Sequence, residues 1–192
     1  MNFLRIYEAN TGTTIVLFLI VILVLIGMIF FLAKSFFREH KRIAEEKALT
    51  IEGVLTRSEI HSVISTYIAR SNDQLQFSLI YMDLDKFTDF VNAFGKKESE
   101  KIIERIIKNV EYVLPKGVKI SRMQNDEFLI FLSMDFDRTE VVDLANKVKA
   151  AIGKQIKLFG DTQINATASI AIAFYPVHGG TLKDLLNSLQ IA

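Results

Sequence analysis

An uninterrupted apolar run near the N-terminus constrains this chain more than any other feature. Residues 15–33 read IVLFLIVILVLIGMIFFLA and contain no charged side chain. At about 1.5 Å per residue, a helix of this length reaches roughly the 30 Å of a bilayer core. A secretory signal peptide usually has a shorter apolar region that ends in a small-residue cleavage site, whereas Phe36 and Phe37 follow this run. The sequence therefore predicts an uncleaved transmembrane helix over residues 15–33.

Cationic side chains flank this run unequally. Arg5 precedes it, with Glu8 nearby, whereas five cations follow it: Lys34, Arg38, Lys41, Arg42 and Lys47. Because the cytoplasmic flanks of membrane helices are enriched in Lys and Arg, we expect a single-pass protein of the cell membrane whose C-terminal part is cytoplasmic. Residues 1–14 would form a short extracytoplasmic N-terminus, and residues 34–52 a helical linker.

The overall composition argues against several other kinds of protein. The 23 Lys and Arg residues are balanced by 22 Asp and Glu residues, for a formal net charge of +1. A general nucleic-acid binder would need a basic face, so we expect no nucleic-acid partner. The chain has no cysteine, which excludes a disulfide framework and a thiolate metal site.

The hydrophobic pattern of residues 53–192 is that of a globular domain. A capping box at Thr56 precedes apolar residues at helical spacing, and the run 77–82 (FSLIYM) is typical of a central strand. The elements expected after it are a helix pair ending near 110, strands over 118–121 and 128–132, a helix over 141–152, a half-buried strand over 164–174 and a last helix from 181. This order predicts an α+β fold, a mixed sheet with flanking helices close to the ferredoxin-like plan.

Two acidic clusters lie where predicted strands end. Asp83 and Asp85 follow the run 77–82, and Asp126 and Glu127 lie at the turn between the two middle strands. Carboxylates brought together across neighbouring strands can hold Mg²⁺ against substrate phosphates, since Mg²⁺ prefers oxygen ligands and takes only one or two from protein. On spacing alone, loop carboxylates that face water are the commoner explanation.

Several segments, in the same order along the chain, resemble the GGDEF domain family. The matching segments are MDLDKF at 82–87 with NAFG at 92–95, RMQNDEF at 122–128, GVLTR at 53–57, and ASIA at 168–171 before the last helix. They resemble the family's DxDxF…(N/D)xxG block, its RxGGDEF hairpin, its GLPNR segment and its late S-I-G strand. The resemblance covers about residues 53–192.

The resemblance implies a fold, a reaction and a set of site residues. GGDEF domains have a palm-like fold similar to that of nucleotide cyclases, and active members join two GTP molecules, one on each of two facing domains, into cyclic di-GMP with Mg²⁺. In that scheme Asp83, the carbonyl of Leu84 and Asp126 would bind the metal. Glu127 would assist at the catalytic turn beside Asp126.

This sequence departs from the family pattern at the positions that bind the nucleotide. Gln124 and Asn125 replace the paired glycines, which take positive φ freely and let backbone approach phosphate. Thr88 replaces a lysine that helps with phosphate, Val91 replaces an asparagine that bonds guanine, and Glu100 replaces an aspartate that reads guanine. Each polar group left unpaired on a buried ligand costs roughly 1–3 kcal/mol, so we expect affinity for GTP to fall by orders of magnitude.

The sequence therefore predicts a degenerate, catalytically inactive GGDEF domain with vestigial Asp126 and Glu127. It would act as a regulatory, dimerising or weakly nucleotide-binding module in cyclic di-GMP signalling, as a homodimer or as the N-terminal part of a larger protein with a downstream phosphodiesterase domain. The alternative is an active diguanylate cyclase. A third possibility is an interaction domain that binds no nucleotide.

Overall fold

A computed structural model describes residue 16 and residues 19–38, 51–70, 76–133, 136–157 and 163–191. The chain divides into two units, Met1–Ala48 and Leu49–Ala192. Each unit is described by itself below.

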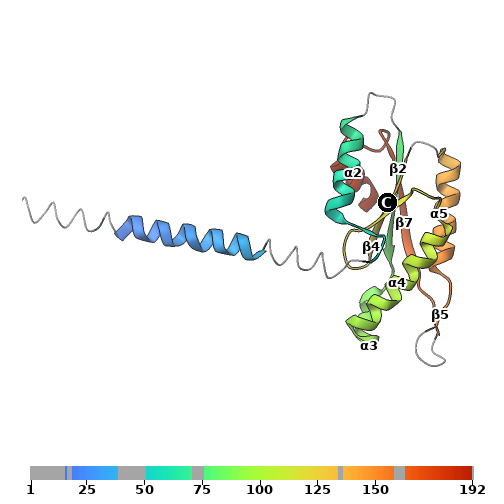
Figure 1. Cartoon of the computed structure of the whole chain (residues 1–192), viewed down its shortest axis with the longest axis horizontal. Coiled ribbons are helices and arrows are strands. Elements are labelled where there is room, and N and C mark those ends of the chain that lie inside the picture. Colours follow the sequence, from blue (N-terminus) through green and yellow to red (C-terminus); the bar gives the residue numbers. More distant parts are fainter. Residues whose placement is uncertain are drawn as a thin grey trace, which may run out of the picture. The chain divides into compact units, whose positions relative to one another are not determined.

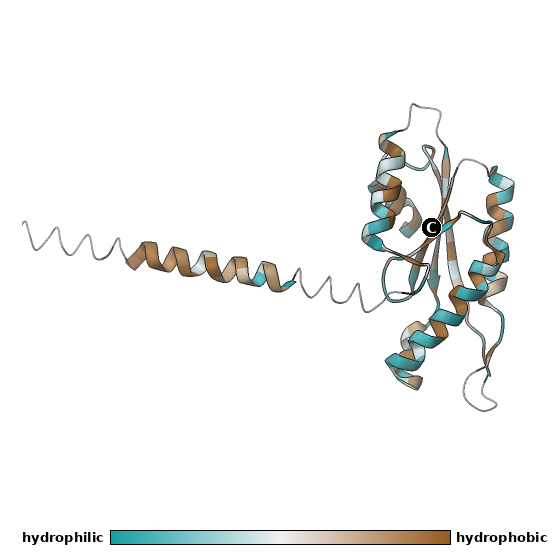
Figure 2. Cartoon of the chain, viewed as in Figure 1, coloured by the Kyte–Doolittle hydropathy of each residue, from teal (hydrophilic) through white to brown (hydrophobic). Residues whose placement is uncertain are grey.

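The N-terminal unit contains a helix over Leu19–Arg38, with a mean hydropathy of 2.7 in its most apolar window and no part of that window buried. Its surface is apolar over most of its length (Figure 2). Its length and composition suit a membrane span, although a signal sequence has the same features. The helix continues past the predicted end at Ala33, and residues 39–50 of the predicted linker lie outside the described part.

The second unit is built on a five-stranded mixed sheet. Its strands are β1 (Leu55–Thr56), β2 (Phe77–Leu84), β3 (Lys119–Arg122), β4 (Glu127–Leu132) and β7 (Ala168–Tyr175), in the spatial order β1-β3-β4-β2-β7. The β1–β3 pair is parallel, and the other three pairs are antiparallel. The predicted mixed sheet with flanking helices is thereby confirmed.

Helices cover both faces of this sheet. They are α2 (Arg57–Ala69), α3 (Phe87–Phe94), α4 (Lys96–Val113), α5 (Arg138–Ile152) and α6 (Leu182–Ile191). Figure 1 shows α2 on one face and α4 and α5 on the other. The buried residues of α2 and α6 form one core with the sheet, and those of α4 and α5 form the second core.

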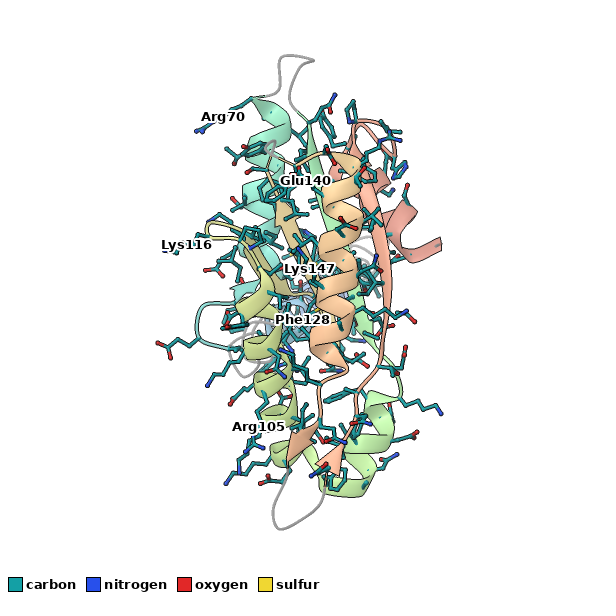
Figure 3. All side chains as sticks on the ribbon, turned by 90° about the vertical axis from the view of Figure 1, so that its right-hand side faces the viewer. Arg70, Arg105, Lys116, Phe128, Glu140 and Lys147 are labelled. Carbon is teal, nitrogen blue, oxygen red and sulfur yellow. The ribbon has the colours of Figure 1, made fainter. Side chains whose placement is uncertain are left out.

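The central strand β2 is apolar except at Ser78 and Asp83, because it is buried on both faces over Phe77–Met82. Leu79 and Tyr81 pack in the core under α2 and α6, whereas Ile80 and Met82 pack under α4 and α5. Side chains alternate between the two faces of a strand, so a strand covered on both sides is apolar at nearly every position. On β4, the fully buried Phe128 lies under α4 and α5 (Figure 3).

Side-chain hydrogen bonds cap the first turns of α2, α5 and α6. The Thr56 hydroxyl accepts the N–H of Glu59, while the Glu59 carboxylate accepts the N–H of Thr56, so the predicted capping box is present. Asp137 and Glu140 form a second capping box at α5. The Thr181 hydroxyl accepts the Asp184 N–H at the start of α6.

The prediction of a single strand over residues 164–174 is wrong. Gln163–Ile164 is β6, which pairs with β5 (Ile156–Lys157) in a separate two-stranded sheet, and β7 begins at Ala168. Both faces of β7 contact core residues, so it is not a strand with one solvent face. The apolar alternation continues through residues 165–167, which connect β6 to β7, so periodicity alone does not detect the change of partner strand.

Candidate functional site

The predicted metal ligands meet where β2 ends and β4 begins. Asp83 lies directly opposite Glu127 in the antiparallel register of these strands. The carbonyl of Asp126, which precedes β4, accepts the N–H of Leu84 at 3.1 Å. The sheet thereby gathers all four predicted metal-binding and catalytic residues at one end of two adjacent strands.

Asp83 and Glu127 line a cavity of about 360 Å³ on the face of the sheet covered by α2 and α6. The other residues lining it are Tyr81, Ser169, Ile170, Ala171, Leu189 and Gln190. Asp126 is not among the lining residues of this cavity. Alternation explains the difference, because Glu127 shares its side of β4 with Leu129 and Phe131, both in the core under α2 and α6.

The Asp83 carboxylate in this cavity is repelled by neighbouring carboxylates. Burial raises the pKa of Asp83, and the negative charges of Asp126, Glu127 and Asp85 raise it further. Burial also raises the pKa of Tyr81, whose hydroxyl bonds to Glu127. A cation between Asp83 and Glu127 would relieve this repulsion, and oxygen ligands suit Mg²⁺.

The described residues contain no group of three or more acids and histidines arranged as a metal cage. Proteins commonly offer Mg²⁺ one or two carboxylates and leave its other positions to phosphate and water. The Asp83 and Glu127 side chains would hold the ion. Bound there, Mg²⁺ would neutralise phosphate charge.

Asp85 has a structural role instead. Its carboxylate accepts the hydroxyls of Thr167 at 2.6 Å and Ser169 at 3.0 Å, and its N–H donates to the Thr167 carbonyl. The Thr167 bond is the main reason that the pKa of Asp85 is lowered. These contacts attach the end of β2 to the start of β7, so Asp85 does not point into the cavity as a free ligand.

A second pocket, of about 300 Å³, lies between the starts of α3 and α4 and the β3–β4 turn. It is lined by Phe87, Thr88, Val91, Lys96, Glu100, Asn125 and Asp126. The structure thus brings together four of the five predicted nucleotide-binding positions, which are Thr88, Val91, Glu100 and Asn125. Gln124 is not among the lining residues.

Glu100 in this pocket is bound by a buried arginine. Arg122 Nη1 lies 2.7 Å from one Glu100 oxygen and Nη2 lies 3.2 Å from the other. Arg122 Nε also donates to the carbonyls of Gln124 at 3.2 Å and Asn125 at 3.0 Å, and Nη2 donates to the Asn125 carbonyl as well. The Arg122 side chain is only 4% exposed, and that of Glu100 is 26% exposed. We call this set of contacts the Arg122 clamp.

The turn at Gln124 and Asn125 does not use the left-handed backbone that its replaced glycines would allow. Among the described non-glycine residues, Lys86 alone has a positive φ, at 58°. The turn therefore does not require Asn125 to adopt left-handed backbone. The turn is held by Arg122 through the two carbonyls, and the substitutions act through their added side chains.

The sequence pattern did not predict all the residues of this site. Tyr81 and Gln190 were not predicted to line a cavity, and Arg122 was recognised only as part of a motif. Tyr81 could have been found from strand alternation, since it lies two residues before Asp83 on the same face of β2. No periodicity pairs Arg122 with Glu100, 22 residues earlier.

Comparison with known proteins identifies the class. The family described as "Diguanylate cyclase, GGDEF domain" matches residues 50–192. The chain therefore belongs to the GGDEF diguanylate cyclase family.

Individual relatives are distant. The chain is 22% identical over 122 residues to the diguanylate cyclase TpbB of Pseudomonas aeruginosa, covering 64% of this chain and 28% of that protein. It is 25% identical over 120 residues to the bifunctional diguanylate cyclase/cyclic di-GMP phosphodiesterase MucR of the same species, covering 62% of this chain and 17% of the relative. The crystal structure of the TpbB GGDEF domain superposes with a TM-score of 0.68 at 20% identity, covering 74% of this chain and 89% of that one. The chain thus spans less than a third of the length of these two curated relatives.

Proposed function

We propose that this chain is a membrane-anchored, catalytically inactive GGDEF domain that binds GTP·Mg²⁺ weakly and regulates cyclic di-GMP signalling. It acts as a homodimer or beside a downstream phosphodiesterase domain. MucR, which by its name combines both activities, supports the second arrangement. The apolar helix Leu19–Arg38 and the cations after it support a single-pass anchor with the domain in the cytoplasm.

The contrast between the two pockets carries this proposal. Asp83 and Glu127 face each other in register and still offer two carboxylates to a metal. In the neighbouring pocket Val91 has no group to bond a base, and both oxygens of Glu100 are bound by Arg122. Metal binding is retained in this view, whereas recognition of guanine is largely lost.

Residues that bind the metal without seating the base correctly cannot align a 3′-hydroxyl with an α-phosphate. Alignment of the reacting atoms supplies much of the acceleration in such reactions. The domain would therefore hold GTP without converting it, and its occupancy would report the nucleotide to a partner domain.

The test uses the full chain in detergent micelles with GTP and Mg²⁺, analysed by liquid chromatography and mass spectrometry. We expect no more cyclic di-GMP than an Asp83→Asn variant gives, together with a small rise in melting temperature that depends on GTP, Mg²⁺ and Asp83. Accumulation of cyclic di-GMP above that of the variant would establish the alternative, an active diguanylate cyclase. If GTP, GDP and ATP all leave the melting temperature unchanged, the domain is an interaction module without a nucleotide.

A restored base contact gives a second, independent test. Val91→Asn adds an amide to the wall of the second pocket, and a hydrogen bond of roughly 1–2 kcal/mol corresponds to about a 5- to 30-fold gain in GTP affinity. Val142→Asn makes the same change at an exposed valine on α5, outside the pocket, and serves as the control. Equal affinities for both variants would mean that GTP does not lie against Val91.

A further inference from the structure

One residue, His178, binds the turn between β7 and α6 to the edge of the sheet. β7 is an edge strand, since it lies at the end of the strand order next to β2, and an edge strand has backbone groups that no neighbouring strand binds. At Phe174 these groups are bound by the turn instead. The His178 N–H donates to the Phe174 carbonyl at 2.8 Å, and the Phe174 N–H donates to His178 Nδ1 at 3.2 Å.

The same turn is also attached to α6. The Ser188 hydroxyl donates to the His178 carbonyl at 2.8 Å. Gly179, the next residue, packs so closely on the first turn of α6 that an added Cβ would lie 2.6 Å from Asp184 Cβ. Because close-packed elements cannot move independently, a movement of the turn is passed on to α6.

The hydrogen bond from Phe174 requires a neutral imidazole. Nδ1 of His178 accepts a hydrogen bond only while it carries no proton, so the proton of the neutral ring is on Nε2. A second proton on the ring would turn Nδ1 into a donor that faces another donor. Histidine is the side chain whose charge ordinarily changes between about pH 5 and 8, so mild acid breaks this bond.

The nearest charge on α5 does not favour a protonated ring. Arg138 lies over the ring of Phe174, 5.1 Å from its centroid. The His178 ring meets the same Phe174 ring edge-on, with the two centroids 5.7 Å apart. A proton on His178 would therefore place a second positive charge beside one aromatic ring.

The charges on α6 offer a protonated ring little compensation. Lys183 and Asp184 lie in the first turn of this helix. The Asp184 carboxylate already accepts the Thr181 hydroxyl at 2.7 Å. Within the described part of the chain, none of the ion pairs includes His178.

α6 connects this turn to the acidic cavity. Leu189 and Gln190 line that cavity together with Asp83 and Glu127, and they directly follow Ser188 in the sequence. The residue that bonds to the His178 carbonyl is thus adjacent to the residues of α6 that line the cavity.

We propose that His178 is a pH-sensitive latch that holds α6 against the end of β7. While the ring is neutral, its bond from Phe174 and the bond from Ser188 fix the turn, and α6 keeps its place beside the acidic cavity. When the ring gains a proton, the bond from Phe174 breaks, the turn loosens and α6 opens more often. The latch depends on the turn alone, whether or not the cavity binds a nucleotide.

Hydrogen exchange of the full chain in detergent micelles, measured by mass spectrometry, tests the latch. Protection factors are compared at about pH 7.5 and about pH 5.5, on either side of the ordinary titration of histidine. We expect protection of the α6 amides to fall about 5-fold at the lower pH, the equivalent of one lost hydrogen bond of about 1 kcal/mol. The amides of α4, which does not contact the turn, serve as the internal reference and should keep their protection.

Two substitutions separate the acceptor from the proton. His178→Asn keeps an acceptor that does not titrate, so α6 should be as protected at both pH values as the wild type is at the higher one. His178→Leu keeps an apolar contact with Phe174 but has no acceptor, so α6 should be as exposed at both pH values as the wild type is at the lower one.

Two other titrating groups near α6 are alternative sources of a pH dependence. His61 lies in the cavity between α2 and α6, and burial and the charge of Arg57 lower its pKa, so its protonation also costs stability as the pH falls. His61→Asn is therefore the matched control and should keep the wild-type fall in protection. Asp83 acts in the opposite direction, because its pKa is raised and stability is lost as the pH rises through it.

The proposal is overturned if α6 of the wild type is equally protected at both pH values, or if His178→Asn retains the fall. A fall that disappears in His61→Asn would assign the effect to the cavity between α2 and α6 and also overturn the latch. So would a His178→Leu variant with the full protection of the wild type at the higher pH. If His178→Leu does not fold, the comparison of His178→Asn with the wild type decides alone.

Discussion

Removing the buried arginine of the Arg122 clamp should destabilise the domain strongly. Arg122→Ala removes both bonds to Glu100 and the donors that satisfy the carbonyls of Gln124 and Asn125. Breaking a buried ion pair by deleting one partner costs about 3–5 kcal/mol. The Glu100 side chain is 26% exposed, so water partly rehydrates it, and we expect the low end of that range, about 3 kcal/mol.

Thermal unfolding of the full chain in detergent, followed by near-ultraviolet circular dichroism of the tyrosines, measures this loss. For a domain of this size, about 3 kcal/mol corresponds to a fall in melting temperature of roughly 10 °C. Lys101→Ala is the matched control, because it breaks the more exposed ion pair Lys101–Glu98. Exposed pairs contribute about 0–1 kcal/mol, so this control should change the melting temperature by no more than a few degrees.

A double-mutant cycle with Glu100→Ala separates the ion pair from the bonds to the turn. Residues in direct contact in one network show coupling energies of about 0.5–3 kcal/mol, and we expect a value above 1 kcal/mol here. The reasoning is refuted if Arg122→Ala costs less than about 1 kcal/mol, or if the effects of the two single substitutions simply add. Either result would mean that the clamp contributes little to holding the turn.

Three further predictions concern other parts of the domain. Asp83→Asn should raise the melting temperature at pH 7. The pKa of Asp83 is raised in the folded state, so the wild-type protein loses stability as the pH rises through that pKa. The difference in melting temperature between the two proteins should therefore disappear near pH 3. Thr56→Ala removes the capping box of α2 and should cost about 1 kcal/mol, seen as faster hydrogen exchange of the first amides of α2, while the α5 capping box at Asp137 keeps its exchange rates. Phe128→Ala empties a fully buried site and should cost about 3–5 kcal/mol in urea titrations, whereas Phe128→Leu should cost clearly less.

The elements of the fold could be predicted because their signals are local. The capping box at Thr56, the double-sided burial of 77–82 and the stop at Gly153 depend on residues that are close in sequence. The β5–β6 pair was missed because each strand has only two residues. Periodicity needs several residues to be recognised, so the second sheet could not be found from the pattern.

The candidate site was less predictable because it depends on contacts between distant segments. Arg122 reaches Glu100 across 22 residues, and Gln190 approaches Asp83 only because α6 packs on one face of the sheet. The family resemblance singled out Thr88, Val91, Glu100 and Asn125, and these four residues share one pocket. The resemblance did not indicate that the Glu100 carboxylate is already paired with the Arg122 guanidinium.

Strand alternation explains why a linear motif describes this site incompletely. Asp126 and Glu127 are neighbours in sequence, yet Asp126 lines the pocket beside α3 and α4, and Glu127 lines the cavity beneath α6. A motif assigns adjacent letters to one site, whereas successive residues at the start of a strand diverge to opposite faces. Glu127, opposite Asp83, is therefore better placed to share a metal with Asp83, and Asp126 is better placed to act on whatever occupies the second pocket. Binding of Mg²⁺, followed by the melting temperature, should accordingly be weakened more by Glu127→Gln than by Asp126→Asn, and the reverse order would assign the metal to the other face.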